Sequence, residues 1–292
     1  MTINYNFKVS LLVWASIFVL IGCSDSNQQI VEAEKKVIRV AVEPSHSGVK
    51  TRIKFDQLLD YLELKTDARF ELVKVNSYTE LIDLFVQKKI DLGYFGGVSF
   101  VIVNERAGAI PLVSRDIDTR FTSTFIINKK SNINSLLDLK EKSFSFGSRL
   151  STSGHFMPRF FLNQKGLNPE AHFDKIIYSG THDKTALLVQ DGTVDAGVLN
   201  SKTVERMLSN GDIDTDKVAI LWKTPRFFAH VWAIQPEFDE KQKAMIEDAF
   251  LELSLYQERQ QSILKSMDAK YFIPISNHDF DSLKKVMNGF NR

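Results

Sequence analysis

The 292-residue chain contains a single cysteine, Cys23, and no excess of either charge, with 37 Lys and Arg against 36 Asp and Glu. One cysteine cannot close an intramolecular disulfide or supply the several thiolates of a cysteine-based zinc site. A nucleic-acid binder needs a basic surface to neutralise phosphates, and this charge balance argues against one. The 43% hydrophobic content argues against a disordered chain, and the length predicts about two domains.

The motifs of common enzyme classes are also missing. There is no Gly-x-x-x-x-Gly-Lys-Ser/Thr loop, and Val101 stands where a Gly-x-Ser-x-Gly elbow through Ser99 would need its second glycine. The six histidines show no metal-ligand spacing. We therefore expect no enzymatic activity, no cofactor and no metal.

No hydrophobic run is long enough to span a bilayer, which takes about 20 residues. The uncharged run Val9–Ile21, which follows Lys8, instead has the length of a signal-peptide core. It ends in Leu20-Ile21-Gly22-Cys23, which resembles a bacterial lipobox. That resemblance implies a lipoprotein signal peptide over 1–22 and a lipid anchor on Cys23. The alternative is an export signal or signal anchor in which Cys23 is incidental.

A polar stretch follows the cysteine, from Ser24 to Gln29, and has no apolar period. It predicts a flexible tether over 23–36. The expected picture is a soluble module held by acyl chains on the periplasmic side of a bacterial membrane, with the inner and the outer membrane both left open.

From residue 37 onward, short β-rich runs alternate with helical patterns, which is typical of an α/β fold with a largely parallel sheet. Ser77 is the expected N-cap of one of these helices. The pattern then restarts, so two similar halves follow one another. The expected strands are 37–42, 70–75, 91–94, 144–146, 176–178 and 196–199, and the expected helices are 51–64, 77–88, 98–107, 156–165 and 181–190.

Two further strand-like runs predict that the chain passes between the halves twice. The first is 120–127, and the second is 221–234, which contains Pro225. The mainly helical segment from Glu240 onward would return to the first half. This predicts lobe 1 from 37–119 with 230–292 and lobe 2 from 120–229, joined by two hinge crossovers around a ligand cleft.

In order and spacing, the motifs resemble those of the phosphonate/phosphite/phosphate-type substrate-binding proteins of ABC transporters. The resemblance covers nearly all of the chain after the signal. It implies a type II periplasmic-binding-protein fold, with a mainly parallel sheet in each lobe, that closes on an oxyanion of phosphorus. The motifs are Ser77-Tyr78, Asp91-Leu92-Gly93-Tyr94-Phe95-Gly96, Ser135-Leu136-Leu137-Asp138-Leu139-Lys140, Phe146-Gly147, Ser151-Thr152-Ser153-Gly154 with Pro158, Ser179-Gly180-Thr181-His182-Asp183 and Val194-Asp195-Ala196-Gly197.

The run Ser151-Thr152-Ser153-Gly154 lies between an expected strand and an expected helix. Hydroxyls and unpaired N–H groups converge at such a helix start, where the helix dipole favours an anion. Simple N-capping explains the run equally well from the residues alone. The resemblance favours Ser151 and Thr152 as ligand donors, with backbone amides from Ser153 and Gly154.

Two more ligand contacts follow from the resemblance. His182, in a similar turn after Gly180, matches a histidine that contacts the oxyanion, and Tyr78 matches a tyrosine that does so from the first lobe. The alternatives are a histidine that caps or packs locally and an apolar residue at a helix start. A histidine N–H can donate to an anion, and the anion would raise the pKa of the histidine.

Four positions bear on specificity because the family's aminoethylphosphonate binders hold the ligand's ammonium with acidic side chains. Lys202, which follows Asn200, stands at one acidic position, and His230 stands near the other. Phe121 replaces a tyrosine. A lysine would repel an ammonium, which predicts a ligand without an amine, unless Lys202 only faces solvent.

The resulting hypothesis is a lipid-anchored periplasmic protein that delivers phosphite, phosphate or an amine-free phosphonate to an ABC permease. The alternative is a sensing module that presents its bound form to a membrane kinase or cyclase.

Overall fold

The computed structural model describes residues 1–3, 35–44 and 48–290. The chain divides into the segment Met1–Glu34 and the body Lys35–Arg292, and the body holds both sheets described below. The predicted signal peptide, the lipidation site Cys23 and most of the predicted tether lie outside the described residues.

The first sheet has six strands and defines lobe 1. Its order is β11-β4-β10-β3-β1-β2, and the helices α1, α2, α3, α8, α9 and α10 belong with it. The strands are β1 (Lys36–Val42), β2 (Ala68–Leu72), β3 (Leu92–Gly96), β4 (Ile110–Arg115), β10 (His230–Ile234) and β11 (Phe272–Pro274). The helices are α1 (Gly48–Lys65), α2 (Tyr78–Val86), α3 (Gly97–Ala107), α8 (Glu240–Leu251), α9 (Glu258–Ser266) and α10 (Asp281–Phe290), with 3-10 turns at Asp116–Arg120 and Asn277–Phe280.

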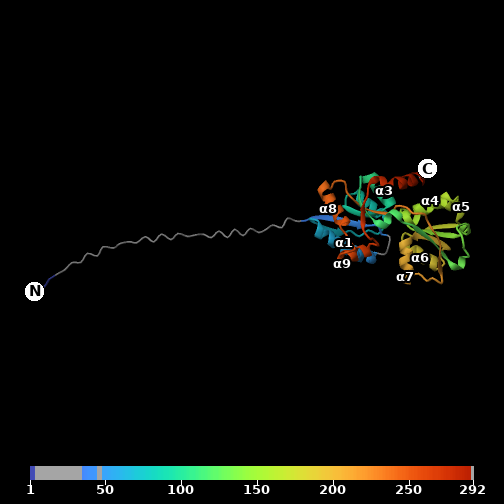
Figure 1. Cartoon of the computed structure of the whole chain (residues 1–292), viewed down its shortest axis with the longest axis horizontal. Coiled ribbons are helices and arrows are strands. Elements are labelled where there is room, and N and C mark those ends of the chain that lie inside the picture. The colour runs from blue at the N-terminus through green and yellow to red at the C-terminus, as the bar shows by residue number, and fades with distance from the viewer. Residues whose placement is uncertain (4–34, 45–47, 291–292) are drawn as a thin grey trace. The chain divides into compact units, whose positions relative to one another are not determined.

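The second sheet has five strands, in the order β7-β6-β8-β5-β9, and defines lobe 2. Figure 1 shows the two lobes side by side, with α1, α8 and α9 on one and α4 to α7 on the other. The strands are β5 (Ser123–Asn128), β6 (Ser143–Phe146), β7 (Lys175–Tyr178), β8 (Ala196–Asn200) and β9 (Val218–Lys223). The helices are α4 (Met157–Gln164), α5 (Pro169–His172), α6 (His182–Gln190) and α7 (Ser201–Ser209), with a π-helical turn at Thr152–Phe156 and 3-10 turns at Lys129–Ser131 and Leu137–Leu139.

The two-lobed α/β fold is confirmed, but both sheets are more mixed than the sequence predicted. In lobe 1, β1 pairs in parallel with β2 and β3, whereas β10 is antiparallel to β3 and β4. In lobe 2, β6 is parallel to β7 and β8, whereas β5 is antiparallel to β8 and β9. In each sheet, an antiparallel strand follows a crossover, namely β5 in lobe 2 and β10 in lobe 1. The chain enters each lobe from the other one there, and it runs opposite to the parallel strands beside it.

The two crossovers meet at one isolated antiparallel bridge, between Phe121 and Phe227. Each of these residues donates its backbone N–H to the carbonyl of the other, at 3.0 and 2.9 Å. On the lobe 2 side, Thr224 continues the contact, because its N–H donates to Ser123 O at 2.9 Å and its hydroxyl accepts from Ser123 N at 2.9 Å. The two connections therefore form a paired hinge.

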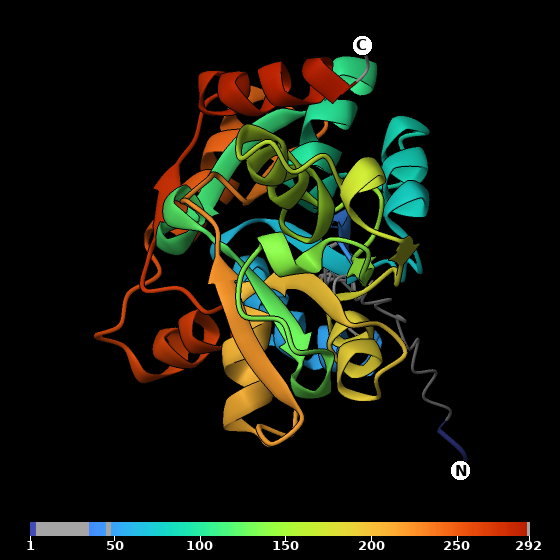
Figure 2. The ribbon, with the colours of Figure 1, turned by 90° about the vertical axis from the view of Figure 1, so that its right-hand side faces the viewer.

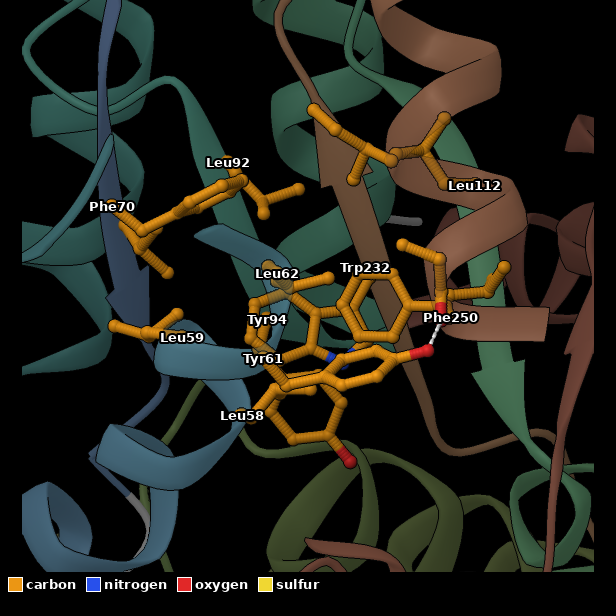
Figure 3. Packing of buried hydrophobic residues seen from close by; sticks show 14 of the residues in the cluster. Leu58, Leu59, Tyr61, Leu62, Phe70, Leu92, Tyr94, Leu112, Trp232 and Phe250 are labelled. Atoms are coloured by element: carbon orange, nitrogen blue, oxygen red, sulfur yellow. Dashed lines mark hydrogen bonds between the residues drawn. The ribbon is translucent and has the colours of Figure 1, made fainter. Parts of the chain in front are cut away.

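Separate apolar clusters stabilise the lobes. Lobe 1 packs α1, α8 and α9 on one face of its sheet, where Trp232 is fully buried beside Phe250 and Tyr94. Figure 3 shows this packing, with the Tyr61 hydroxyl bonded to the carbonyl of Ala249 at 3.0 Å. Lobe 2 has its own clusters on the two faces of its sheet.

A further cluster crosses from one lobe to the other. It combines α2, α3 and β10 of lobe 1 with Met157 and Phe161 of α4 and with the hinge residues Phe121 and Phe227. The C-terminal helix α10, red in Figure 2, contributes Leu283. We call this interlobe cluster the seam.

Most expected elements are present within a few residues of their predicted bounds. Ser77 is the N-cap of α2 and accepts from Glu80 N at 3.0 Å, as predicted. β2 begins at Ala68 rather than 70, and β4 and β11 were missed. The expected lobe boundaries at 119/120 and 229/230 stay a prediction.

Candidate functional site

The turn 151–154 follows β6 and opens the helical segment that becomes α4. Ser151 is its N-cap, and the Ser151 hydroxyl accepts from Gly154 N at 2.9 Å. The first helical bond runs from Phe156 N to Ser151 O at 3.0 Å, so the helix leaves the amides of Thr152 and Ser153 available. A π-helical turn of this kind is a frequent feature of functional sites. All of residues 151–154 are buried.

Gly154 is the point of closest approach in this turn. A methyl group on its Cα would lie 3.0 Å from His182 Cε1, 3.0 Å from Ser151 Oγ and 3.3 Å from Gly147 Cα. Ser123 fixes the turn from the hinge side, since its hydroxyl donates to Ser153 O at 2.6 Å. The turn is therefore packed tightly against His182 from α6.

His182 is the first residue of α6, after a turn that requires glycine at 180, where φ is +89°. The imidazole is buried, and its Nδ1 accepts from Asn200 N at 3.4 Å. A neutral ring whose Nδ1 accepts carries its proton on Nε2, so Nε2 is the donor. Asn200 thus orients His182, and its own side chain caps α7 by accepting from Thr203 N at 2.7 Å.

Lobe 1 meets this turn through the first residues of α3. The Thr152 hydroxyl accepts from Val98 N at 2.9 Å, across the lobes. Because a hydroxyl has one donor and two acceptor positions, Thr152 keeps its own O–H to donate.

Tyr78, at the start of α2, also reaches across. It is buried, and its hydroxyl is hydrogen-bonded to Ser151. Burial and the nearby charge of Glu43 raise the pKa of Tyr78 well above its usual value, so the phenol stays neutral.

Glu43 is a site residue that the sequence analysis missed. It follows β1 directly and is buried, with its Oε1 accepting from the Ser99 hydroxyl at 2.6 Å. Burial raises the pKa of Glu43 to about 7, while hydrogen bonds from Ser99 and the Gly96 backbone act in the opposite direction. A carboxylate at the carboxyl end of a buried strand was the available signal, because the ends of neighbouring parallel strands meet at one edge.

We call Glu43, Tyr78, the turn 151–154 and His182 the interlobe site. Its lobe 2 donors are hydroxyls, backbone amides and one imidazole. Such a set can hold a tetrahedral oxyanion by directed dipoles, without a buried Lys or Arg. Among residues 35–44 and 48–290, no group of His, Cys, Asp or Glu side chains could hold a metal ion.

The family model described as ABC transporter, phosphonate, periplasmic substrate-binding protein matches residues 40–280. The chain belongs to this family. As a periplasmic substrate-binding protein of the phosphonate type, it is a transport component rather than an enzyme, as the sequence predicted. No helix in the described part of the chain is long and apolar enough to cross a membrane.

Individual members of the family are similar over most of this substrate-binding protein. The probable ABC transporter phosphite-binding protein PhnD1 of Prochlorococcus marinus (strain MIT 9301) is 32% identical over 275 residues, which is 90% of this chain and 92% of the relative. The phosphate-import protein PhnD of Mycolicibacterium smegmatis is 24% identical over 310 residues, 98% of this chain and 97% of the relative. The structure of the Prochlorococcus PhnD1 in complex with methylphosphonate superposes with a TM-score of 0.83 and 31% identity, over 88% of this chain and 98% of that one.

Three of the four predicted specificity residues lie in different settings, and the fourth, Asn200, contacts His182 as described above. Lys202 is on the surface of α7, where its Nζ pairs with Glu205 at 2.8 Å. His230 is in lobe 1, where its Nδ1 pairs with Asp118 at 3.0 Å and its ring stacks on Tyr94. Phe121 is in the hinge bridge, edge-on to His230 with ring centroids 5.4 Å apart. The structure thus brings Tyr78, residues 151–154 and His182 together. Asn200 contacts His182 through its backbone N–H, and Lys202 forms an ion pair with Glu205.

Proposed function

We propose that this substrate-binding protein captures a small phosphorus oxyanion without an amine, namely phosphite, phosphate or an alkylphosphonate, at the interlobe site and delivers it to an ABC permease. The observation that carries the proposal is the bond between Thr152 and Val98 N, because it places the donor turn of lobe 2 against the first turn of a lobe 1 helix. A ligand held there touches both lobes, and its binding would favour their closed arrangement.

The chemistry of the donors supports an oxyanion. The Thr152 hydroxyl accepts from Val98 N–H, which leaves its O–H to donate, and the hydroxyls of Ser151 and Tyr78, which bond to each other, and the His182 imidazole complete the polar set. The relatives named for phosphite and phosphate, and the one bound to methylphosphonate, agree with this class of ligand.

Two positions support the absence of an amine. At 202 the side chain is an ammonium paired with Glu205, and at 230 it is an imidazole paired with Asp118. Neither residue is itself a carboxylate that could pair with a ligand ammonium, as the acidic residues of aminoethylphosphonate binders do.

A thermal-shift titration of the protein from residue 24 onward tests this function. Phosphite, phosphate, methylphosphonate and aminoethylphosphonate are compared at equal concentration and pH. A ligand at 100 times its Kd adds about 2.7 kcal/mol to the unfolding free energy, which raises Tm visibly. We expect an amine-free oxyanion to stabilise most. Stabilisation mainly by aminoethylphosphonate would contradict the specificity, and no shift with any of the four would contradict the ligand class.

We also propose that Cys23 carries the lipid anchor, because residues 20–23 resemble a lipobox. Mass spectrometry of the protein purified from bacterial membranes should find acyl chains on an N-terminal Cys23. The Cys23→Ser variant should appear in the soluble fraction. An unmodified, uncleaved N-terminus would overturn this part of the proposal.

A further inference from the structure

Glu43 is the one buried carboxylate of the interlobe site, and its position is fixed by the first turn of α3. Oε1 accepts from Ser99 at 2.6 Å. Oε2 lies so close to Gly96 that a Cβ there would be only 2.7 Å away. Glycine at 96 is therefore what lets the carboxylate reach the helix start.

The same turn of α3 also holds Thr152. Val98 N, which donates to the Thr152 hydroxyl, lies between Gly96 and Ser99 in the sequence. Tyr78 joins the two sides, because its hydroxyl is bonded to Ser151 and its ionisation is opposed by the charge of Glu43. Glu43 and Thr152 are therefore both bonded to the first turn of α3, and we infer that an oxyanion accepting from Thr152 lies near the Glu43 carboxylate.

Among the residues whose side chains the structure describes (35–44 and 55–289), no cation contributes to the charge balance of Glu43. The groups that face it are Ser99 from α3, the amide of Gly96 at the end of β3, Tyr94 from β3 and Tyr78 from α2. His46 and the side chains of Lys50, Arg52 and Lys54, which are close in sequence, lie outside this description. An ionised carboxylate and an anion that share a buried space repel each other strongly.

One proton removes this repulsion. It can be carried by the ligand as P–OH and donated to the carboxylate, or by Glu43 as COOH and donated to a ligand oxygen. The proton count is the same in both cases, and so is the hydrogen bond between the two oxygens. The raised pKa of Glu43, about 7, makes this proton available near neutrality.

Resting on the proposed function, we propose that Glu43 determines specificity by binding the acidic proton of the ligand, so that the site prefers tetrahedral oxyanions with a titratable hydroxyl. Phosphite, phosphate and alkylphosphonates have such a proton near neutral pH. Sulfonates have none and bind only when Glu43 itself is protonated.

Methanesulfonate is the decisive probe, because it matches methylphosphonate in shape but does not titrate between pH 5.5 and 8.5. Its affinity and that of methylphosphonate are measured calorimetrically across this range. For the wild type we expect methanesulfonate binding to weaken by up to tenfold for each pH unit above about 7. In Glu43→Gln we expect this added slope to vanish and the preference for methylphosphonate at pH 8 to fall at least tenfold.

Glu247→Gln is the matched control. Glu247 is a second glutamate whose pKa is raised by burial, but it lies on α8, away from the interlobe site. It should keep the wild-type slope and preference. Because His182 is present in all of these proteins, the difference between wild type and Glu43→Gln isolates the carboxyl group.

Ser99→Ala tests the same idea if Glu43→Gln folds poorly. It removes the hydroxyl bond that lowers the pKa of Glu43, so the decline in methanesulfonate binding should begin at higher pH. Equal slopes and equal preferences in wild type and Glu43→Gln would overturn the proposal. So would tighter binding of aminoethylphosphonate that is lost in Glu43→Gln, because Glu43 would then pair with an ammonium. Failure of wild type to bind any phosphorus oxyanion contradicts the proposed function instead.

Discussion

The two lobes bury different kinds of polar side chain. Lobe 1, with the 3-10 turn Asp116–Arg120, buries carboxylates and cations, including Glu43, Arg115, Asp118 and Lys243. From Ser123 to Thr224, in lobe 2, the buried polar side chains are hydroxyls, amides and two histidines, with no Asp, Glu, Lys or Arg. Lobe 2 therefore presents neutral donors to the site, and lobe 1 brings the charge.

This difference separates anion binding by neutral donors from the compensation of buried charge. A neutral donor turn holds an anion by hydrogen bonds whose strength changes little with pH, whereas the charged groups of lobe 1 must be balanced by pairing or by a proton. Arg115 and Asp118 balance each other with two bonds of 2.8 Å, and His230 adds a third contact. Glu43 has no such partner among the side chains described in 35–44 and 55–289, and burial favours its protonated form.

The largest expected effect is on stability, from breaking the buried pair in lobe 1. Although burial opposes ionisation, Arg115 and His230 hold the pKa of Asp118 at about 2. Asp118→Asn leaves the Arg115 guanidinium buried without its counter-charge, and should lower the unfolding free energy by about 3–5 kcal/mol. Denaturant titration measures the loss. Asp212→Asn, which breaks an exposed pair with Arg206 in lobe 2, should change it by less than about 0.5 kcal/mol. Similar losses of unfolding free energy in the two variants would contradict the proposed difference between the lobes.

The second effect is on how stability depends on pH. Because the folded-state pKa of Glu43 is raised from 4.5 to about 7, its contribution is complete below pH 4.5 and is lost as pH rises through 7. The loss amounts to about 3 kcal/mol, at about 1.4 kcal/mol for each pH unit between the two values. Relative to Glu43→Gln, wild-type Tm should therefore fall between pH 5 and pH 8. Parallel Tm curves would show that Glu43 titrates normally.

The third effect tests the contact between the lobes. Thr152→Val removes the hydroxyl that accepts from Val98 N and should cost about 1–3 kcal/mol, seen as weaker binding of methylphosphonate and a lower Tm. Thr203→Val is the control, since the Thr203 hydroxyl is buried in lobe 2 without a hydrogen-bond partner. Its removal should be neutral or slightly stabilising. A loss in Thr203→Val equal to that in Thr152→Val would assign the effect to shape rather than to the bond.

The smallest expected effect concerns the packing of the donor turn. Gly154→Ala adds a methyl group 3.0 Å from His182 Cε1, which displaces the imidazole and should weaken methylphosphonate binding by about tenfold, or about 1.4 kcal/mol. Gly289→Ala has no atom within 4 Å of the added methyl and should bind normally. Unchanged affinity in Gly154→Ala would show that the turn adapts without loss.

The lobe 2 side of the site was more predictable from the sequence than the lobe 1 side, for a physical reason. Residues 151–154 form a local motif at a helix start, where capping and amide geometry follow from neighbours in the sequence. The Glu43 carboxylate is bonded to Ser99 and Gly96, which are far away in the sequence. No local sequence pattern therefore predicted that Glu43 belongs to the site. β4 was missed for a similar reason, because its partner β10 returns from the hinge much later in the chain.

The predicted specificity positions show the limit of aligning single residues. Lys202 and His230 were identified by their place in a motif, but their partners decide what they do. Glu205 holds Lys202 on the helix surface, and Asp118 with Tyr94 holds His230 on the α1 side of the lobe 1 sheet. Their roles in selectivity stay predictions, and the four-ligand titration tests them.

The seam gives the hinge a resting preference. Met157 and Phe161 of lobe 2 pack with the hinge and lobe 1 through apolar contacts that need no ligand, with Phe161 and Phe227 ring centroids 6.4 Å apart. Apolar burial favours this arrangement of the lobes without any ligand, so under the proposed function a ligand would supply only the remainder of the free energy of closure. The affinity of the proposed site would then depend partly on Met157 and Phe161, which pack in the seam rather than in the interlobe site.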